Sequence, residues 1–108
     1  MSVTAPVRIP VELRRRGGAR WFRLARGVSE VGLVFGGPLP EELDGPIDVA
    51  FRLPDDDNPS DIQLTGRAVS VETGDEAAPE QRLAIRFIKP AEESRARIAR
   101  YVAARVPA

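Results

Sequence analysis

The sequence contains no cysteine and no histidine. Without cysteine the chain forms no disulfide, has no thiolate nucleophile and holds no metal through sulfur. Without histidine it also lacks the usual general base near neutral pH and a common zinc ligand. Carboxylates remain as catalytic groups, but the sequence shows no paired motif of them. We therefore expect no enzyme, no metal site and no cofactor.

Long apolar runs are missing as well. No stretch approaches the roughly 20 apolar residues that a membrane-spanning helix needs. Residues 1–6 have neither the basic flank nor the apolar run of a secretion signal. The sequence thus predicts a cytoplasmic protein without membrane insertion. Its 108 residues are enough for one modest hydrophobic core, so we expect a single domain.

Charges of the two signs are separated along the chain, although the net charge is zero. Residues 1–35 carry seven arginines against Glu12 and Glu30, residues 36–80 carry twelve acids against two arginines, and residues 81–108 are again basic. Non-specific affinity for nucleic acid comes mainly from neutralising phosphates. A neutral chain therefore predicts no DNA or RNA partner.

Apolar and polar residues alternate over residues 7–14, which predicts a strand with Val7, Ile9, Val11 and Leu13 on its buried face. Pro10 lies on the other face and cannot donate to a ladder, so the strand is expected at an edge or unpaired there. A hairpin turn follows, because paired glycines suit the positive φ angles that such turns require. These glycines are Gly17 and Gly18.

A second strand is predicted over residues 20–26. Taking Phe22 and Leu24 as its buried residues places Trp21, Arg23 and Ala25 outside. An outward Trp21 beside Arg20 suits a contact with a partner protein, because Trp and Arg are favoured in interface hot spots. The alternative is a strand shifted in phase by one residue, with Trp21 in the core.

Four more strands and one helix complete the prediction. Residues 27–32 form a turn, and strands follow from residue 33, over residues 47–53, over residues 62–71 with a bulge after Gly66, and over residues 82–87. Residues 54–61 and 73–80 are polar loops. The run Asp55, Asp56, Asp57 and Asp61 is a solvated loop rather than a cation site, since it lacks the glycine and final glutamate of an EF-hand.

Proline, acids and then arginines predict a helix over residues 90–106, with Ile98, Tyr101 and Val102 on its apolar stripe. The fold class is therefore mainly β: a small six-stranded antiparallel β-barrel with one C-terminal α-helix. The single domain, residues 1–108, divides into a flexible arm at residues 1–7, the barrel at residues 8–88 and the helix.

This order of elements resembles the PilZ domain over nearly the whole chain. The resemblance rests on the hairpin, the small-residue turn at residues 27–32, the Pro-rich loop, and the stretches LTGRAV at residues 64–69 and LAIRF at residues 83–87. It implies a bacterial domain of cyclic di-GMP signalling. In that family the nucleotide is held by an RxxxR stretch before the first strand and by a D/N-x-S-x-x-G stretch after the second.

The chain keeps part of these motifs. Ser29 and Gly32 match the second motif, but Gly27 stands at its Asp/Asn position. Arg8 aligns with the second arginine of the first motif, and Thr4 with the first arginine. A second RxxxR stretch runs from Arg16 to Arg20. It lies across the first hairpin rather than before the first strand, so we attribute it to chance in an arginine-rich region.

Two functions follow from the resemblance. The leading one is a regulatory adaptor that binds an unknown protein, with weak or no nucleotide binding, and in which Ser29 and Gly32 only form a turn. The alternative is a cyclic di-GMP receptor that uses Arg8, the residue 27–32 turn and nearby arginines, namely Arg14, Arg16, Arg23 and Arg26. In that case residues 1–8 would become ordered over the ligand. Motility, secretion and biofilm formation are the processes that the resemblance suggests.

Overall fold

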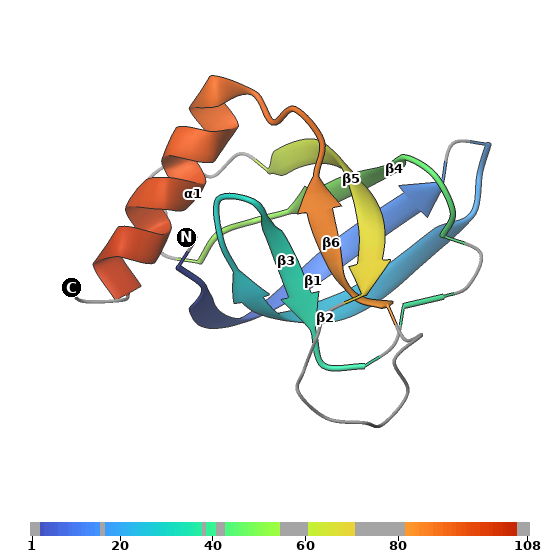
Figure 1. Ribbon diagram of the computed structural model, residues 1–108, viewed down its shortest axis with the longest axis horizontal. Helices are drawn as coiled ribbons and strands as arrows, with labels where there is room; N and C mark the ends of the chain where they lie inside the picture. The colour runs from blue at the N-terminus through green and yellow to red at the C-terminus, as the bar shows by residue number, and fades with distance from the viewer. Residues whose placement is uncertain are drawn as a thin grey trace.

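Six antiparallel strands close into a barrel in the order β1-β2-β3-β6-β5-β4, and one helix follows them in the computed structural model of the protein (Figure 1). The elements are β1 (Ala5–Arg15), β2 (Arg20–Val28), β3 (Gly32–Phe35), β4 (Ile47–Phe51), β5 (Ile62–Ser70), β6 (Arg82–Phe87) and α1 (Glu92–Arg105). The structure describes residues 3–15, 17–37, 39–40, 43–54, 61–70 and 82–105. The predicted fold class is confirmed.

Alternating apolar residues fill the barrel. The predicted inward residues of β1 and β4 are buried, except that Val7 is half-buried against the core. Leu39 and Leu43, from the Pro-rich connection between β3 and β4, also belong to the core. This connection therefore contributes to the interior, although its composition indicates only a loop.

The first strand begins at Ala5, three residues before the start of the barrel that the sequence predicts. Ala5 is fully buried and lies opposite Val28 of β2. The β1–β4 pairing starts only at Val11, so Pro10 precedes it and has β2 as its neighbour. The prediction of a strand partly unpaired at Pro10 therefore agrees with the register, but β1 is not an edge strand.

Of the two phases predicted for β2, the one with Phe22 and Leu24 inside is wrong, and the alternative with Trp21 on the core side is observed. Phe22 is 64% exposed and Leu24 is 39% exposed, whereas Ala25 is fully buried and Trp21 packs partly buried against the core. Directly opposed residues of antiparallel strands point to the same face. Trp21 lies opposite the buried Leu13, so it must face inward. The strand also continues to Val28, which places Gly27 in a strand rather than in a turn.

The predicted bulge after Gly66 is also wrong. The pairing of β5 with β6 runs without a shift from Gly66 to Val69, and the irregularity lies between Val69 and Ser70. Gly66 and Ala68 are both buried, so they lie on the same inward face of β5. The alternation of apolar residues seemed to change phase here because Val69 is more apolar than Ala68, although Ala68 is the inward residue.

Helix α1 lies at one end of the barrel, and the β1–β2 hairpin extends at the other end (Figure 1). Ile98 and Val102 are buried beneath the helix and Tyr101 packs partly against the core. The hairpin turn has the positive φ values expected of Gly17 and Gly18, 110° and 134°. Among the described residues, no helix is long and apolar enough to cross a bilayer. Most of the two predicted polar loops lies outside the described residues.

Two adjacent residues of β2 test the corrected phase. Trp21→Ala should lower the free energy of unfolding by about 2 kcal/mol, because it removes a large side chain packed on the core. Phe22→Ala should change it by less than about 0.5 kcal/mol, since Phe22 is an exposed side chain. Urea denaturation of both variants measures the difference. Equal losses would contradict the register described above.

Candidate functional site

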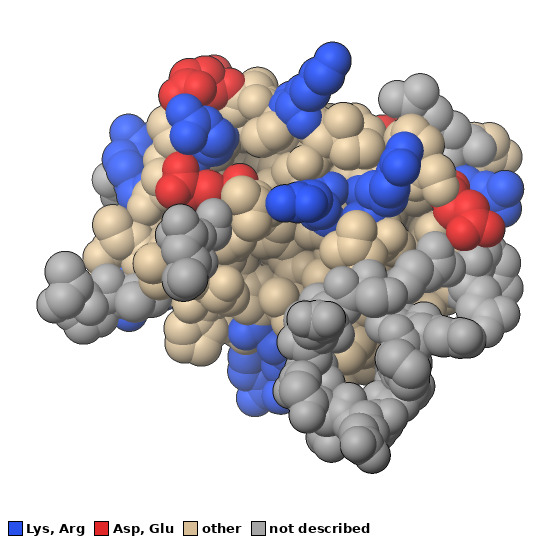
Figure 2. Space-filling view, in the orientation of Figure 1, with Lys and Arg blue, Asp and Glu red and all other residues tan. Residues whose placement is uncertain are grey.

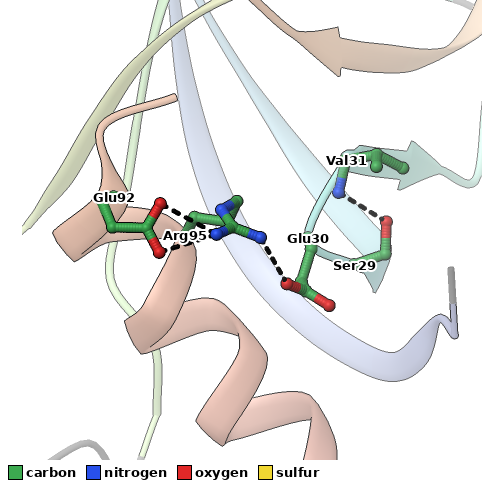
Figure 3. Close-up of polar contacts among 5 residues, drawn as sticks. All are labelled: Ser29, Glu30, Val31, Glu92 and Arg95. Atoms are coloured by element: carbon green, nitrogen blue, oxygen red, sulfur yellow. Dashed lines mark hydrogen bonds and ion pairs between the residues drawn. The ribbon is translucent and has the colours of Figure 1, made fainter. Parts of the chain in front are cut away.

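The β2–β3 turn, residues 29–31 with Gly32 after it, lies beside the start of α1 (Figure 3). Ser29 is only 5% exposed. Its hydroxyl accepts a hydrogen bond from the Val31 N–H at 3.2 Å and donates to the Gly32 carbonyl at 3.5 Å. The Ser29 N–H also donates to the Gly32 carbonyl at 2.9 Å. Both capacities of the hydroxyl are thus used inside the turn.

Gly32 is required by close packing of backbone. A Cβ atom at this position would overlap the carbonyl oxygen of Ile85 in β6. Gly32 pairs with Arg86 in the β3–β6 ladder, and the Phe87 N–H donates to the Val31 carbonyl at 2.8 Å. The glycine therefore lets β3 approach β6 at the point where the turn joins the ladder.

Gly27 and Thr4 lie next to each other. A Cβ atom at Gly27 would stand 2.7 Å from Thr4 Cγ2, 3.6 Å from Val34 Cβ and 3.7 Å from the Ala5 carbonyl oxygen. The Thr4 methyl group thus fills the space that a side chain at position 27 needs. The two motif positions at which this chain departs from the family pattern are in contact with each other.

Arg8 and Arg26 both lie at irregular positions of the ladders, and the Arg26 side chain lies next to Gly36. The β1–β2 register shifts between Pro6 and Ile9, where β1 has one residue more than β2. Arg26 is the residue of β2 that faces this shift, and the β2–β3 register shifts there too. Both arginines are exposed, and neither has an acidic partner among the described residues.

The other predicted arginines do not gather at the turn. Arg23 lies opposite the buried Val11 and so shares the face of Trp21, whereas Arg26 lies at the irregularity with its side chain next to Gly36. The Arg23 Nη1 group donates to the Phe22 carbonyl at 3.0 Å. Arg14 and Arg20 lie opposite each other at the far end of the hairpin. Arg16 lies outside the described residues.

Arg95 of α1 connects the helix to the turn. It makes two hydrogen bonds to Glu92, of 2.7 and 2.8 Å, and one of 3.4 Å to Glu30, as Figure 3 shows. The hydrogen bonds and charge of Glu92 raise the pKa of Arg95 above its ordinary value. All three side chains are exposed, so this network orients the helix start rather than adding much stability.

Two hollows lie on the surface of the described residues. One, of about 380 Å³, is lined by Glu30, Val31, Arg86, Phe87, Pro90 and Arg95, next to the turn. The other, of about 400 Å³, lies across β1, β4 and β5 and includes Glu12, Arg14, Asp48, Asp61, Gln63 and Thr65. Asp61 forms an ion pair with Arg52 at 3.0 Å. Among the described residues, no cluster of acids is arranged to hold a metal ion.

Basic side chains also stand together over β6 and β5, apart from the acidic ones on that face (Figure 2). The register explains this, because Arg67 of β5 lies directly opposite Arg86 of β6. Like charges in that position are destabilising. Sequence spacing gave no sign of this pair, which depends on which strands are neighbours.

The PilZ domain model matches residues 5–104. Several solved structures share the fold, and two of them illustrate the similarity. One is the inhibitor of motility MotI/DgrA of Bacillus subtilis, with a TM-score of 0.71 and 14% identity over 97% of this chain and 49% of that one. The other is the PilZ domain of CeSA from a cellulose-synthesizing bacterium, with a TM-score of 0.61 and 20% identity over 93% and 94%. This chain thus spans about half of the MotI/DgrA chain. No curated protein sequence matches significantly.

The packing of Gly32 is open to a direct test. Gly32→Ala should lower the free energy of unfolding by about 2–3 kcal/mol, because its Cβ meets backbone that cannot rotate away. Gly37→Ala is the matched control, since an added Cβ there has no neighbour within 4 Å. Its unfolding free energy should stay within about 0.5 kcal/mol of wild type. A Gly32→Ala variant as stable as Gly37→Ala would contradict this packing.

Proposed function

The chain belongs to the PilZ family, and on that premise we propose that it is a cytoplasmic regulatory adaptor that acts by binding another protein. In this proposal its affinity for cyclic di-GMP is weak or absent, and it is not an enzyme. The family is typical of cyclic di-GMP-related signalling and consists of regulatory binding domains. What distinguishes this member is the state of the two nucleotide-binding motifs.

The observation that carries the proposal is the contact between Thr4 and Gly27. The family pattern has an arginine at the first position and an Asp or Asn at the second, and both interact with the nucleotide. Here the Thr4 methyl group fills the space next to Gly27, within 2.7 Å of where a Cβ would stand. The guanidinium that would bind phosphate and the Asp or Asn side chain that would bind guanine are thus both absent, and the Thr4 methyl group lies in the space beside Gly27.

Ser29 and Gly32, the two motif residues that remain, each have a structural role that is enough to explain their presence. The Ser29 hydroxyl is used by Val31 and Gly32, and Gly32 is required by the approach of β3 to Ile85. Neither observation needs a nucleotide. Their retention therefore supports a preserved turn rather than a preserved binding site.

A receptor function is the second candidate, and one observation favours it. Arg8 and Arg26 are both exposed at the β1–β2 irregularity, without an acidic partner among the described residues. Two such arginines suit a phosphate, since guanidinium groups bind it bidentately. Arg23 lies in the regular part of the ladder, opposite Val11, and not at this irregularity.

The similar structures suggest processes for the adaptor. MotI/DgrA is described as an inhibitor of motility, and CeSA comes from a cellulose-synthesizing bacterium. We propose motility or biofilm formation as the setting of this protein, with a protein of the same process as its partner.

Calorimetric titration with cyclic di-GMP separates the two candidates, with cyclic di-AMP and GTP as controls. We expect no saturable heat and no rise in melting temperature at about 100 μM ligand, since stabilisation requires a ligand concentration near or above Kd. Saturable binding at micromolar concentration would overturn the adaptor proposal. Loss of that binding in Arg8→Ala and Arg26→Ala would then assign the receptor site.

Restoring the motifs tests the reason for weak binding. The double variant Thr4→Arg/Gly27→Asp removes the methyl group and supplies both missing side chains, so it should bind cyclic di-GMP at least tenfold more tightly than wild type. Gly27→Asp alone should be less stable than the double variant, because Thr4 still occupies the space. If the double variant gains no affinity, the two substitutions are not what limits binding.

A further inference from the structure

The outer face of the β1–β2 hairpin carries apolar side chains at its centre. Phe22 is 64% exposed and Leu24 is 39% exposed, and they are consecutive outward residues of β2. Pro10, also exposed, lies directly opposite Leu24. A contiguous exposed apolar patch on a small domain indicates a site of interaction more often than a single exposed residue does.

Arginines lie at both ends of this apolar centre. At one end Arg14 lies directly opposite Arg20, and at the other end Arg26 faces the irregularity that contains Arg8. We call this surface, residues 8, 10, 12, 14, 20, 22, 24 and 26, the arginine-flanked face. All of these side chains are exposed except Glu12, which is half-buried.

The charge of the face is strongly positive. Glu12 is the one acidic residue of this face, and its Oε1 atom lies 3.8 Å from Arg20 Nε. Asp48 of β4 lies opposite Arg14 on the side away from β2, so it borders the face. Arg8, Arg14 and Arg26 have no ion pair among the described residues. Arginines directly opposite each other and an exposed Phe22 both cost stability in the isolated domain.

We propose that the arginine-flanked face binds an acidic segment of a partner protein that has apolar side chains between two acidic ends. This inference rests on the adaptor function proposed above and gives the chemistry of its partner. Phe22 is the apolar anchor, because aromatic residues dominate interface energetics. The arginine pairs bind carboxylates at the two ends, where the guanidinium groups suit bidentate contacts.

The strand geometry sets the length of the segment. Six residues separate Arg14 from Arg8, which at about 3.3 Å per residue is roughly 20 Å. An extended segment of about six residues, or a helix of about thirteen, spans that distance. The partner segment therefore has its acids roughly 20 Å apart, with its apolar residues between them.

Charge argues against a second copy of the chain as the occupant. A two-fold contact through this face would bring arginines at both ends against arginines of the other copy. Like charges brought together in an interface oppose association. An acidic protein segment neutralises both ends, so it is the occupant that the charges favour.

Two matched synthetic peptides test the proposal on the full chain. Each has thirteen residues with Leu and Ile at its centre, and the ends are all Glu in one peptide and all Lys in the other. Trp21 is the single tryptophan and lies next to Phe22 in sequence, so its fluorescence reports binding. Amide NMR shifts during the same titration show which strands are contacted.

We expect the Glu peptide to bind saturably, with shifts concentrated in β1 and β2, and the Lys peptide not to bind. Phe22→Ser and the charge reversals Arg20→Glu and Arg26→Glu should each weaken binding at least tenfold. Arg100→Glu, an exposed arginine of α1, is the matched control and should leave the affinity unchanged. Melting temperatures confirm that each variant is folded.

Four outcomes of the binding experiments would overturn the proposal. They are absence of Glu-peptide binding, equal weakening by Arg100→Glu, NMR shifts outside β1 and β2, and tighter binding to 3:1 phosphatidylcholine–phosphatidylglycerol vesicles than to the Glu peptide. Dimerisation through this face, measured by sedimentation, would also overturn it. These results leave the adaptor function standing, because that function fails on a different measurement, saturable binding of cyclic di-GMP.

Discussion

The pairing of β1 with β2 on one side and with β4 on the other is the constraint on which the rest of the structure depends. It closes the barrel, and it transfers the inward phase of β1 to both neighbours. Because Leu13 faces the core, Trp21 must do so, and Phe22 is left outside. The irregularity in the β1–β2 ladder places Arg26 across from the stretch of β1 that contains Arg8. The core, the candidate nucleotide site and the arginine-flanked face thus all follow from one register.

The turn between β2 and β3 shows how a family motif can persist for structural reasons. Ser29 is held by hydrogen bonds within the turn, and Gly32 is required where β3 meets Ile85. The turn is also joined to α1 through Glu30 and Arg95. All of these contacts are made within the protein. Thr4 and Gly27, the two positions at which this chain departs from the family pattern, lie next to each other.

Strands whose two faces differ clearly in polarity could be predicted from the sequence. This holds for β1 and β4, where every second residue is apolar, and for the glycine pair of the first hairpin. The phase of β2 could not be predicted, because Trp21, Phe22, Leu24 and Ala25 place apolar residues on both of its faces. The phase of β5 failed for a similar reason at Ala68 and Val69. In both strands only the partner strand decides which face is buried.

The sequence by itself determined the class of fold, the family and the incomplete state of the two motifs, because these depend on residue identity and on spacing along the chain. Only the tertiary structure decided that Thr4 fills the space beside Gly27, that Arg26 falls at an irregularity of the ladder and Arg23 does not, and that Arg67 lies opposite Arg86. Each of these depends on the register between strands that are distant in sequence. Register arises from packing of the whole barrel, so it cannot be read from one strand at a time.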